Sequence, residues 1–260
     1  MSGTLAGLFD LTGRVAIVTG GSRGLGLQIA SALGEFGASL AVVARKQADL
    51  DSAVEHLGLT GCTAVGFAAD LGTPEAAADL TARVIERFGR IDILVNNAGT
   101  TWGAPAEDYP VDGWNKVLAL NVTGLFLLTQ AVARQAFLKQ GKGAVVNVAS
   151  VEGLLGHHSD RLGTVAYNAA KGAVISMTRA LAAEWGPRNV RVNALAPGFF
   201  PSRMTKVVLE RHGDECLRQT PLGKLGGDTD LMGAAVLLTS DAGGHITGQT
   251  LVIDGGASII

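Results

Sequence analysis

The stretch RVAIVTGGSRGLG, residues 14–26, decides the fold expected for this chain. Its first part, Arg14–Thr19, is a run of β-branched and small apolar residues, as in a strand buried on both faces. Its second part carries Gly20, Gly24 and Gly26 with the spacing G-x-x-x-G-x-G, which differs from the commonest fingerprint, G-x-G-x-x-G. Glycines at a strand-to-helix turn let a pyrophosphate approach the positive end of the helix. The alternative is a simple turn in a glycine-rich chain, but the position directly after a strand favours the pyrophosphate site.

Short apolar runs alternate with helical windows along the rest of the chain. The runs expected to be strands are Arg14–Thr19, Ser39–Ala44, Thr63–Ala69, Ile91–Asn96, Ala144–Ala149, Arg191–Ala196 and Thr250–Asp254. One helical window is well marked, because Thr73 can cap it, Pro74 suits its first position and Gly89 can end it. Such alternation predicts an α/β fold, a Rossmann-type doubly wound parallel sheet of about seven strands with helices on both faces. Without repeats, low-complexity tracts or linkers, residues 1–260 are expected to form a single domain.

The composition excludes several classes of protein. Hydrophobic residues make up 47% of the 260 and charged residues 17%, which favours a large core over disorder. A net charge of −2 gives no electrostatic footprint for nucleic acid, and the longest apolar runs, such as Ala144–Ala149, are only as long as strands. Cys62 and Cys216 make no disulfide framework, and Met1–Arg14 lacks the features of a signal peptide. We therefore expect a cytoplasmic protein that binds neither nucleic acid nor membranes.

Polar and glycine-rich residues collect directly after the expected strands. Asp70 follows the third strand, Asn97-Ala98-Gly99 the fourth, Ser150 the fifth and Pro197-Gly198 the sixth. In an open parallel sheet, ligands bind outside the carboxyl ends of the strands. We therefore expect these residues to share one site with the glycine-rich turn.

The end of the second strand bears on the choice of cofactor. NAD-binding proteins usually carry an acid there that holds the ribose 2′-hydroxyl, but this strand ends Val43-Ala44-Arg45-Lys46. Arg45, with Arg23 from the glycine-rich turn, is a candidate partner for a ribose 2′-phosphate, because a guanidinium offers forked, charged donors. The alternative is that both arginines are solvated surface residues. We favour NADP(H) over NAD(H).

Tyr167 and Lys171 stand four residues apart, on one face of an expected helix. A free phenol has a pKa near 10, and a nearby ammonium and an oxidised nicotinamide both favour the phenolate. In a reduction, the phenol would donate a proton to a carbonyl oxygen as hydride arrives at carbon. Ser150 can hydrogen-bond that same oxygen. Asn121 is polar inside an apolar helical stretch, for which the alternative is an asparagine satisfied within a helix bend.

Together these motifs resemble the short-chain dehydrogenase/reductase family from about Gly13 to Gly256. The motifs that carry the resemblance are Thr19–Gly26, Asn96-Asn97-Ala98-Gly99, Asn121, Ser150, Tyr167 with Lys171, and Pro197-Gly198, in the order of the family. The resemblance implies a homotetrameric enzyme that moves a hydride between NADP(H) and a ketone or secondary alcohol.

The resemblance also implies roles for particular residues. Ser150, Tyr167 and Lys171 would be catalytic, and Asn121 would hold a water that connects Lys171 to solvent. Lys171 would also bind the nicotinamide ribose, and Asp70 would contact the adenine. The implied cofactor-binding residues are Gly20, Ser22, Arg23, Gly24, Leu25, Gly26, Arg45, Asp70, Leu71, Asn97, Ala98, Gly99, Tyr167, Lys171, Pro197, Gly198 and Ser202, with no metal ligand among them.

Three further stretches resemble the NADPH-dependent β-ketoacyl reductases of the rhamnolipid-biosynthesis type. They are Asn97–Gly103 (NAGTTWG), Tyr109–Trp114 and Pro197–Thr205 (PGFFPSRMT), and they favour a 3-oxoacyl substrate. An NAD(P)-dependent dehydrogenase of a sugar, steroid or dihydrodiol is the alternative. A dinucleotide-sensing protein without catalysis is a remoter one, since such a protein is expected to lose the tyrosine or the lysine.

Two departures from the family pattern concern the substrate side. Ser202 stands where many members carry a threonine, and 17 positions separate Ser150 from Tyr167, more than is usual. We expect the extra residues, His157–Leu162, to affect the choice of substrate, with Phe199, Phe200 and Trp102 as an apolar wall opposite; the alternative is a surface flap.

Overall fold

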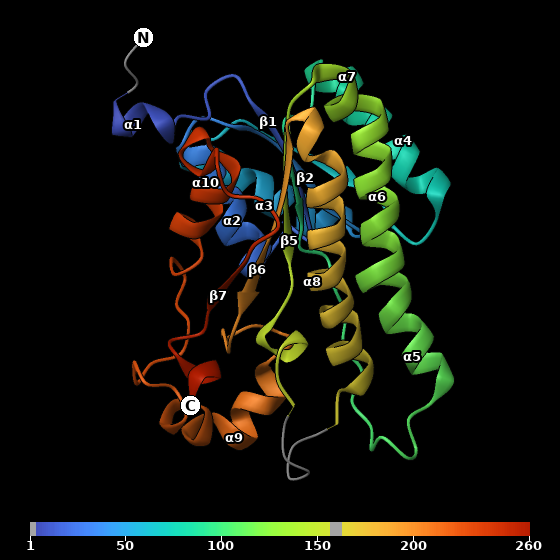
Figure 1. Ribbon diagram of the computed structural model, residues 1–260, viewed down its shortest axis with the longest axis vertical. Coiled ribbons are helices and arrows are strands. Elements are labelled where there is room, and N and C mark those ends of the chain that lie inside the picture. Colours follow the sequence, from blue (N-terminus) through green and yellow to red (C-terminus); the bar gives the residue numbers. More distant parts are fainter. Residues whose placement is uncertain (1–3, 157–162) are drawn as a thin grey trace.

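The strands form a single twisted sheet at the centre of the molecule (Figure 1). The computed structural model describes residues 4–156 and 163–260, and within these the sheet has seven strands in the order β3-β2-β1-β4-β5-β6-β7. The strands are β1 Val15–Thr19, β2 Ser39–Ala44, β3 Ala64–Ala68, β4 Ile93–Asn96, β5 Gly143–Val148, β6 Val190–Pro197 and β7 Thr250–Ile253. Every neighbouring pair is parallel, and the order reverses between β1 and β4. The expected doubly wound sheet is confirmed.

Helices cover both faces of this sheet (Figure 1). The main helices are α2 Gly24–Glu35, α3 Gln47–Leu59, α4 Pro74–Phe88, α5 Val111–Leu118, α6 Leu125–Val132, α8 Val165–Trp185, α9 Lys206–Arg218 and α10 Met232–Thr239, with short α1 Leu5–Leu8 and α7 Leu138–Gln140. Helices α2, α3 and α10 lie on one face, and α4, α6 and α8 on the other.

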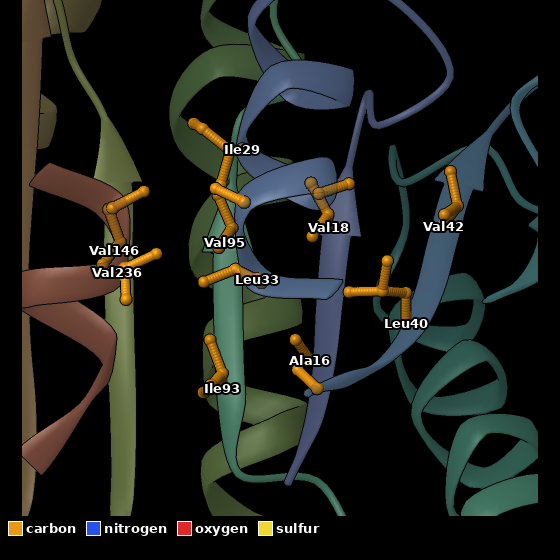
Figure 2. Packing of buried hydrophobic residues seen from close by; sticks show 14 of the residues in the cluster. Ala16, Val18, Ile29, Leu33, Leu40, Val42, Ile93, Val95, Val146 and Val236 are labelled. Atoms are coloured by element: carbon orange, nitrogen blue, oxygen red, sulfur yellow. The ribbon is translucent and has the colours of Figure 1, made fainter. Parts of the chain in front are cut away.

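Alternate residues of β1 pack into two hydrophobic cores, one on each face of the sheet. Ala16 and Val18 of β1 pack with α2 and α10 on one face; Figure 2 shows Ile29 and Leu33 near them, and Val236 of α10 beside Val146. Val15 and Ile17 of the same strand pack on the opposite face with α4, α6 and α8. Successive side chains of a strand point to opposite faces, so a strand buried on both is apolar throughout. This explains why the strands read as continuous apolar runs.

The ends of several strands differ from those expected by one or two residues. β4 begins at Ile93 rather than Ile91, because the backbone of Ile91 pairs with the side chain of Gln140 instead of a neighbouring strand. The Gln140 amide donates to the Ile91 carbonyl at 2.7 Å and accepts from its N–H at 3.4 Å. β6 runs from Val190 to Pro197, and is thus longer than expected.

Helix α4 has the ends that its sequence indicated. The Thr73 hydroxyl accepts the Ala76 N–H at 3.2 Å, Pro74 occupies the first position, and Gly89 ends the helix in the left-handed region with φ of 79°. Thr73 thus pairs one of the free N–H groups at the start, Pro74 has no N–H to leave unpaired, and the Gly89 N–H donates to the Ile85 carbonyl at 2.7 Å at the end.

The run Val111–Gln140 is long and apolar enough to cross a membrane by length and composition alone. In the structure it packs against α4 and α8 on one face of the sheet, as a core helix does. It is not a regular α-helix, because Ala119–Gly124 and Ala133–Phe137 are π-helical. Asn121 lies in the first of these turns, where the sequence indicated at most a bend.

Candidate active site

The glycine-rich turn after β1 has a backbone that larger residues would not fit. Gly20 has φ of 62° and Gly24 has φ of 54°, both in the left-handed region. A Cβ on Gly26 would collide with the Gly20 carbonyl oxygen and with the side-chain amide of Asn97. The space beside Gly24 is therefore open, whereas the backbone of Gly20 is in direct contact with Gly26 of α2.

A hydrogen-bond network joins this turn to the loop after β4. The Thr19 hydroxyl accepts the N–H groups of Asn97 and Ala98 at 2.9 and 3.0 Å. The Asn97 amide in turn donates to the carbonyls of Thr19 and Gly20 at 3.0 and 3.2 Å. The two loops therefore form one rigid unit at the point where the strand order reverses, which is where α/β sheets bind ligands.

A cavity of about 1260 Å³ lies outside the carboxyl ends of the strands. Nearly all the residues that the sequence assigned to a cofactor or to catalysis line it. These are Gly20, Ser22, Arg23, Gly24, Leu25, Arg45, Asp70, Leu71, Asn97, Ala98, Gly99, Ser150, Tyr167, Lys171, Pro197, Gly198 and Ser202. Gly26 and Asn121 lie behind the lining, Gly26 beneath the glycine-rich turn and Asn121 beneath Gly99.

The two arginines expected at the 2′-phosphate differ in their surroundings. Arg45 is exposed and has no ion-pair partner among residues 4–156 and 163–260. Arg23 is paired instead, its Nη1 lying 3.0 Å from Oδ2 of Asp49. Asp49 was not predicted to belong to the site, because a carboxylate in the first turn of a helix is ordinary.

Ser150, Tyr167 and Lys171 come together inside the cavity. Lys171 is only 4% exposed, and its Nζ donates to the Val148 carbonyl at 2.6 Å and lies 5.4 Å from the centre of the Tyr167 ring. Ser150 and Tyr167 line the cavity beside Lys171. Ser150 Oγ accepts the Glu152 N–H at 3.2 Å, so its own hydrogen remains to be donated.

Burial governs the protonation of the tyrosine and the lysine. It raises the pKa of Tyr167 to about 12, while the hydrogen bond from Ser150 lowers this pKa and the charge of Glu152 raises it. Burial also lowers the pKa of Lys171 to about 8. In the protein without cofactor, desolvation thus disfavours the phenolate. The lowering expected from the ammonium together with an oxidised nicotinamide stays a prediction for the cofactor-bound protein.

The side chain of Asn121 is hydrogen-bonded to the loop after β4. Its Oδ1 accepts the Thr100 N–H at 2.8 Å and its Nδ2 donates to the Thr100 carbonyl at 2.9 Å. A Cβ on Gly99 would lie 3.3 Å from Asn121 Oδ1 and 3.8 Å from Lys171 Nζ, so both side chains approach Gly99 closely. The π-helical turn thus places Asn121 near the lysine, in keeping with the frequent occurrence of such turns at functional sites.

Asn168 is a site residue that the sequence analysis did not single out. Its Nδ2 donates to the Glu152 carbonyl at 2.8 Å, to Glu152 Oε2 at 2.9 Å and to the Leu155 carbonyl at 3.3 Å. Its Oδ1 accepts the Thr164 hydroxyl at 2.8 Å. One amide therefore ties the segment after Ser150 to the helix that carries Tyr167. No local sequence signal marks this link, because the Leu155 and Glu152 groups to which the amide donates are 13 and 16 residues away in the chain.

The expectations for the substrate side were met in part. Phe199 and Phe200 line the cavity, whereas Trp102 packs over Gly113 and beneath the Lys116 ammonium. The segment His157–Leu162, expected to affect substrate choice, lies outside the described residues. Among residues 4–156 and 163–260, no three His, Cys, Asp or Glu side chains are grouped to hold a metal ion.

Comparison with known proteins identifies the family. Residues 14–213 match the family model for short chain dehydrogenase, and the chain belongs to this family. It is an oxidoreductase acting on an alcohol or ketone. It is 38% identical over 254 residues to gluconate 5-dehydrogenase of Gluconobacter oxydans, covering 97% of each chain.

Two further relatives bear on cofactor and substrate. The rhamnolipids biosynthesis 3-oxoacyl-[acyl-carrier-protein] reductase of Pseudomonas aeruginosa is 38% identical over 258 residues, covering 95% of this chain and 97% of the relative. The crystal structure of a gluconate 5-dehydrogenase from Burkholderia cenocepacia in complex with NADP and tartrate superposes with a TM-score of 0.93. It is 32% identical and covers 99% of this chain and 100% of its own.

Asn168→Ala tests whether this amide sets the geometry of the site. The substitution removes the bonds to Glu152 and Leu155, so Ser150 should lose its fixed position beside Tyr167. We expect kcat to fall about tenfold or more, because small misplacements of catalytic groups are costly, while the KM for the cofactor stays nearly constant. Gln135→Ala removes another side-chain amide that donates to a backbone carbonyl, 3.2 Å from Ala78 O, and should leave both constants unchanged. Equal kcat in the two variants would contradict the assignment.

Lys171→Met tests the energetic cost of burying the ammonium. Burial lowers the pKa of Lys171 from its ordinary value of 10.5 to about 8 in the folded protein. Between these pH values the unfolded chain binds more protons, so the parent gains stability as pH rises, whereas the variant has no such gain. The variant should be the more stable protein below pH 8, by at most about 3 kcal/mol less the lost hydrogen bond to Val148.

Urea unfolding at pH 7, 8, 9 and 10 measures this difference in free energy of unfolding. The advantage of the Lys171→Met variant should shrink steadily above pH 8. A difference that stays constant from pH 7 to pH 10 would show that burial does not shift the lysine pKa.

Proposed function

We propose that this protein is an NADP(H)-dependent oxidoreductase that interconverts a ketone and a secondary alcohol. The observation that carries the proposal is that Ser150, Tyr167 and Lys171 line the same cavity as the glycine-rich turn and Arg45. A proton donor and an anion-binding turn thus open onto one space that a dinucleotide and a small substrate can share.

The residues present fit the cofactor. The turn Gly20–Gly26 leaves room for a pyrophosphate where a Cβ would fill the space, and it leads into the N-terminus of α2. Arg45 offers an exposed guanidinium without a competing acid beside it in the sequence, which suits a 2′-phosphate. The NADP bound to the related gluconate 5-dehydrogenase supports the same choice.

In the reduction, Tyr167 is the proposed proton donor. Its pKa of about 12 means that the phenol carries its proton at neutral pH and can transfer it to the carbonyl oxygen. The Ser150 hydroxyl donates a hydrogen bond to that same oxygen as negative charge develops on it. When bound, the cofactor supplies or accepts the hydride, and its oxidised ring adds a positive charge. Lys171, at 5.4 Å from the Tyr167 ring, stabilises the phenolate that remains.

In the oxidation, the same residues act in reverse. Tyr167 must then accept the proton of the alcohol, which its high pKa opposes until positive charge gathers near it. Asn121 is proposed to hold a water that links Lys171 to solvent; its proximity to Lys171 across Gly99 supports this role.

Two substrate classes fit the cavity. The apolar part of the lining is formed by Phe199, Met204, Val207 and Val208. Together with the similarity to the rhamnolipid reductase, it supports a 3-oxoacyl substrate for this protein. The polar part of the lining is formed by Glu152, Thr164 and Arg203. Together with the similarity to the gluconate 5-dehydrogenases, it supports a polyhydroxylated substrate. We take the 3-oxoacyl reduction as the first proposal and the sugar reaction as the second.

The family resemblance also carries the proposals of a homotetramer and of a cytoplasmic location. Light scattering on the purified protein measures the number of subunits and would contradict the first by showing a monomer.

A substrate panel decides between the two classes. NADPH oxidation should be followed with acetoacetyl thioesters, 5-ketogluconate, a neutral ketose and a simple diketone. The proposed function predicts turnover with at least one ketone, and the first proposal predicts the highest kcat/KM for the thioester. A clear preference for 5-ketogluconate or the ketose would replace the 3-oxoacyl assignment with the sugar assignment.

Arg45 should decide the cofactor preference. NADPH should exceed NADH about ten- to a hundredfold in kcat/KM, since a hydrogen bond to a charged group contributes about 1.5–3 kcal/mol. Ala44→Asp combined with Arg45→Ala should erase or invert this preference. Arg188→Ala, an exposed arginine elsewhere, is the charge-matched control for the loss of Arg45. Equal efficiency of the parent with both cofactors would end the proposal for NADP(H).

Tyr167→Phe should separate chemistry from binding. The change removes the proton donor and leaves the ring, so turnover should fall by about a hundredfold or more while NADPH still binds. Stopped-flow turnover and fluorescence titration of NADPH measure the two effects. Normal turnover in this variant would rule out Tyr167 as the proton donor.

A further inference from the structure

Asp49 belongs to the cavity but has no role in the function proposed above. It lies in the first turn of α3 and lines the cavity together with Arg23, Arg45 and Lys46. The register Thr19↔Val43 between β1 and β2 sets the glycine-rich turn beside the loop that starts α3. This topology brings a carboxylate from one loop against an arginine from the other.

Asp49 forms an ion pair with Arg23, and within the described part of the chain none is found between Asp49 and Arg45. Asp49 Oδ2 lies 3.0 Å from Arg23 Nη1, and the two side chains are 34% and 54% exposed. A pair this exposed contributes little to stability, so its removal should not unfold the protein. The effect of the ion pair on a bound anion is larger. The guanidinium and the carboxylate together carry no net charge, so the pair attracts an anion less than a free guanidinium does.

We infer that Asp49 is a specificity-determining residue, because it holds Arg23 as a counter-ion and thereby weakens the selectivity of this chain for a cofactor that carries a 2′-phosphate. The inference rests on the proposed use of NADP(H). It assigns unequal parts to the two arginines. Arg45 provides most of the selectivity, and Arg23 provides its full charge only when Asp49 releases it.

Two consequences distinguish this arrangement from one in which Asp49 merely orients Arg23. Neutralising Asp49 should strengthen the binding of a 2′-phosphate, whereas loss of an orienting partner would weaken it. The loss of Arg23 should also matter more once Asp49 is neutral, since residues that interact directly give non-additive effects.

The experiment measures binding to the protein without substrate, so it does not depend on turnover. Calorimetric titrations use adenosine 2′,5′-bisphosphate, which carries the 2′-phosphate, and 5′-AMP, which lacks it. Asp49→Asn should tighten the bisphosphate about three- to tenfold, as expected when one nearby charge is removed at the surface, and leave 5′-AMP within about twofold.

Asp51→Asn is the matched control. Asp51 lies on the same helix and the substitution changes the same charge, but its side chain is bonded to Gln47 at 2.8 Å and does not line the cavity. This control should show no comparable gain for the bisphosphate. Bisphosphate affinity in Asp49→Asn that is equal to, or weaker than, that in Asp51→Asn would overturn the inference.

Variants of Arg23 complete the test. In the parent, Arg23→Ala should weaken the bisphosphate less than Arg45→Ala does. In the Asp49→Asn background, Arg23→Ala should have a distinctly larger effect than in the parent. An identical effect in both backgrounds would show that Asp49 does not act through Arg23.

The preference of the parent protein for one probe shows whether a negative result concerns Asp49 alone or the NADP(H) assignment as well. If it prefers the bisphosphate to 5′-AMP and Asp49→Asn does not increase this preference, the inference fails and the NADP(H) assignment stands. If neither protein discriminates between the two probes, both the inference and the NADP(H) assignment fail.

Discussion

The hydrogen bonds between Thr19 and Asn97 hold together the parts on which the site depends. They fasten the loop after β1 to the loop after β4, at the point where the order of the strands reverses. Gly20 and Gly26 are required there because the backbone of the turn touches α2 and the side chain of Asn97 directly. A rigid floor results at the carboxyl edge of the sheet, where each following loop adds side chains to one cavity. The site is therefore a consequence of parallel strands meeting at a common edge.

The cavity gains its chemistry by burying groups that prefer water. Lys171 is nearly inaccessible, and its pKa is lowered to about 8 while that of Tyr167 is raised to about 12. Both shifts disfavour the charged form, so the protein alone favours the proton donor over the base. Asn168 limits the freedom of this pair by fixing the segment after Ser150 against α8. Groups held at an energetic cost to folding are common where function requires them.

Much of the fold follows from local patterns, and so it could be predicted. The apolar runs mark the strands because both faces of the sheet are covered, and Thr73 and Gly89 mark the ends of α4. The lining of the cavity was predictable for the same reason, since it follows strand ends. Asp49 and Asn168 were not, because their partners come from other segments and ordinary surface residues carry the same sequence signals. Protonation escaped prediction as well, since desolvation depends on packing that no short motif contains.

The central claim is that hydride from NADPH reaches a carbonyl carbon inside this cavity while Tyr167 donates a proton to the carbonyl oxygen. The most direct measurement is the position of the label after reduction of an accepted ketone with NADPH deuterated at C4 of the nicotinamide. With the correct face of the ring labelled, the account predicts one deuterium on the carbinol carbon of the alcohol, and none after the opposite face is labelled. Reduction that places no deuterium on that carbon with either labelled cofactor would contradict it.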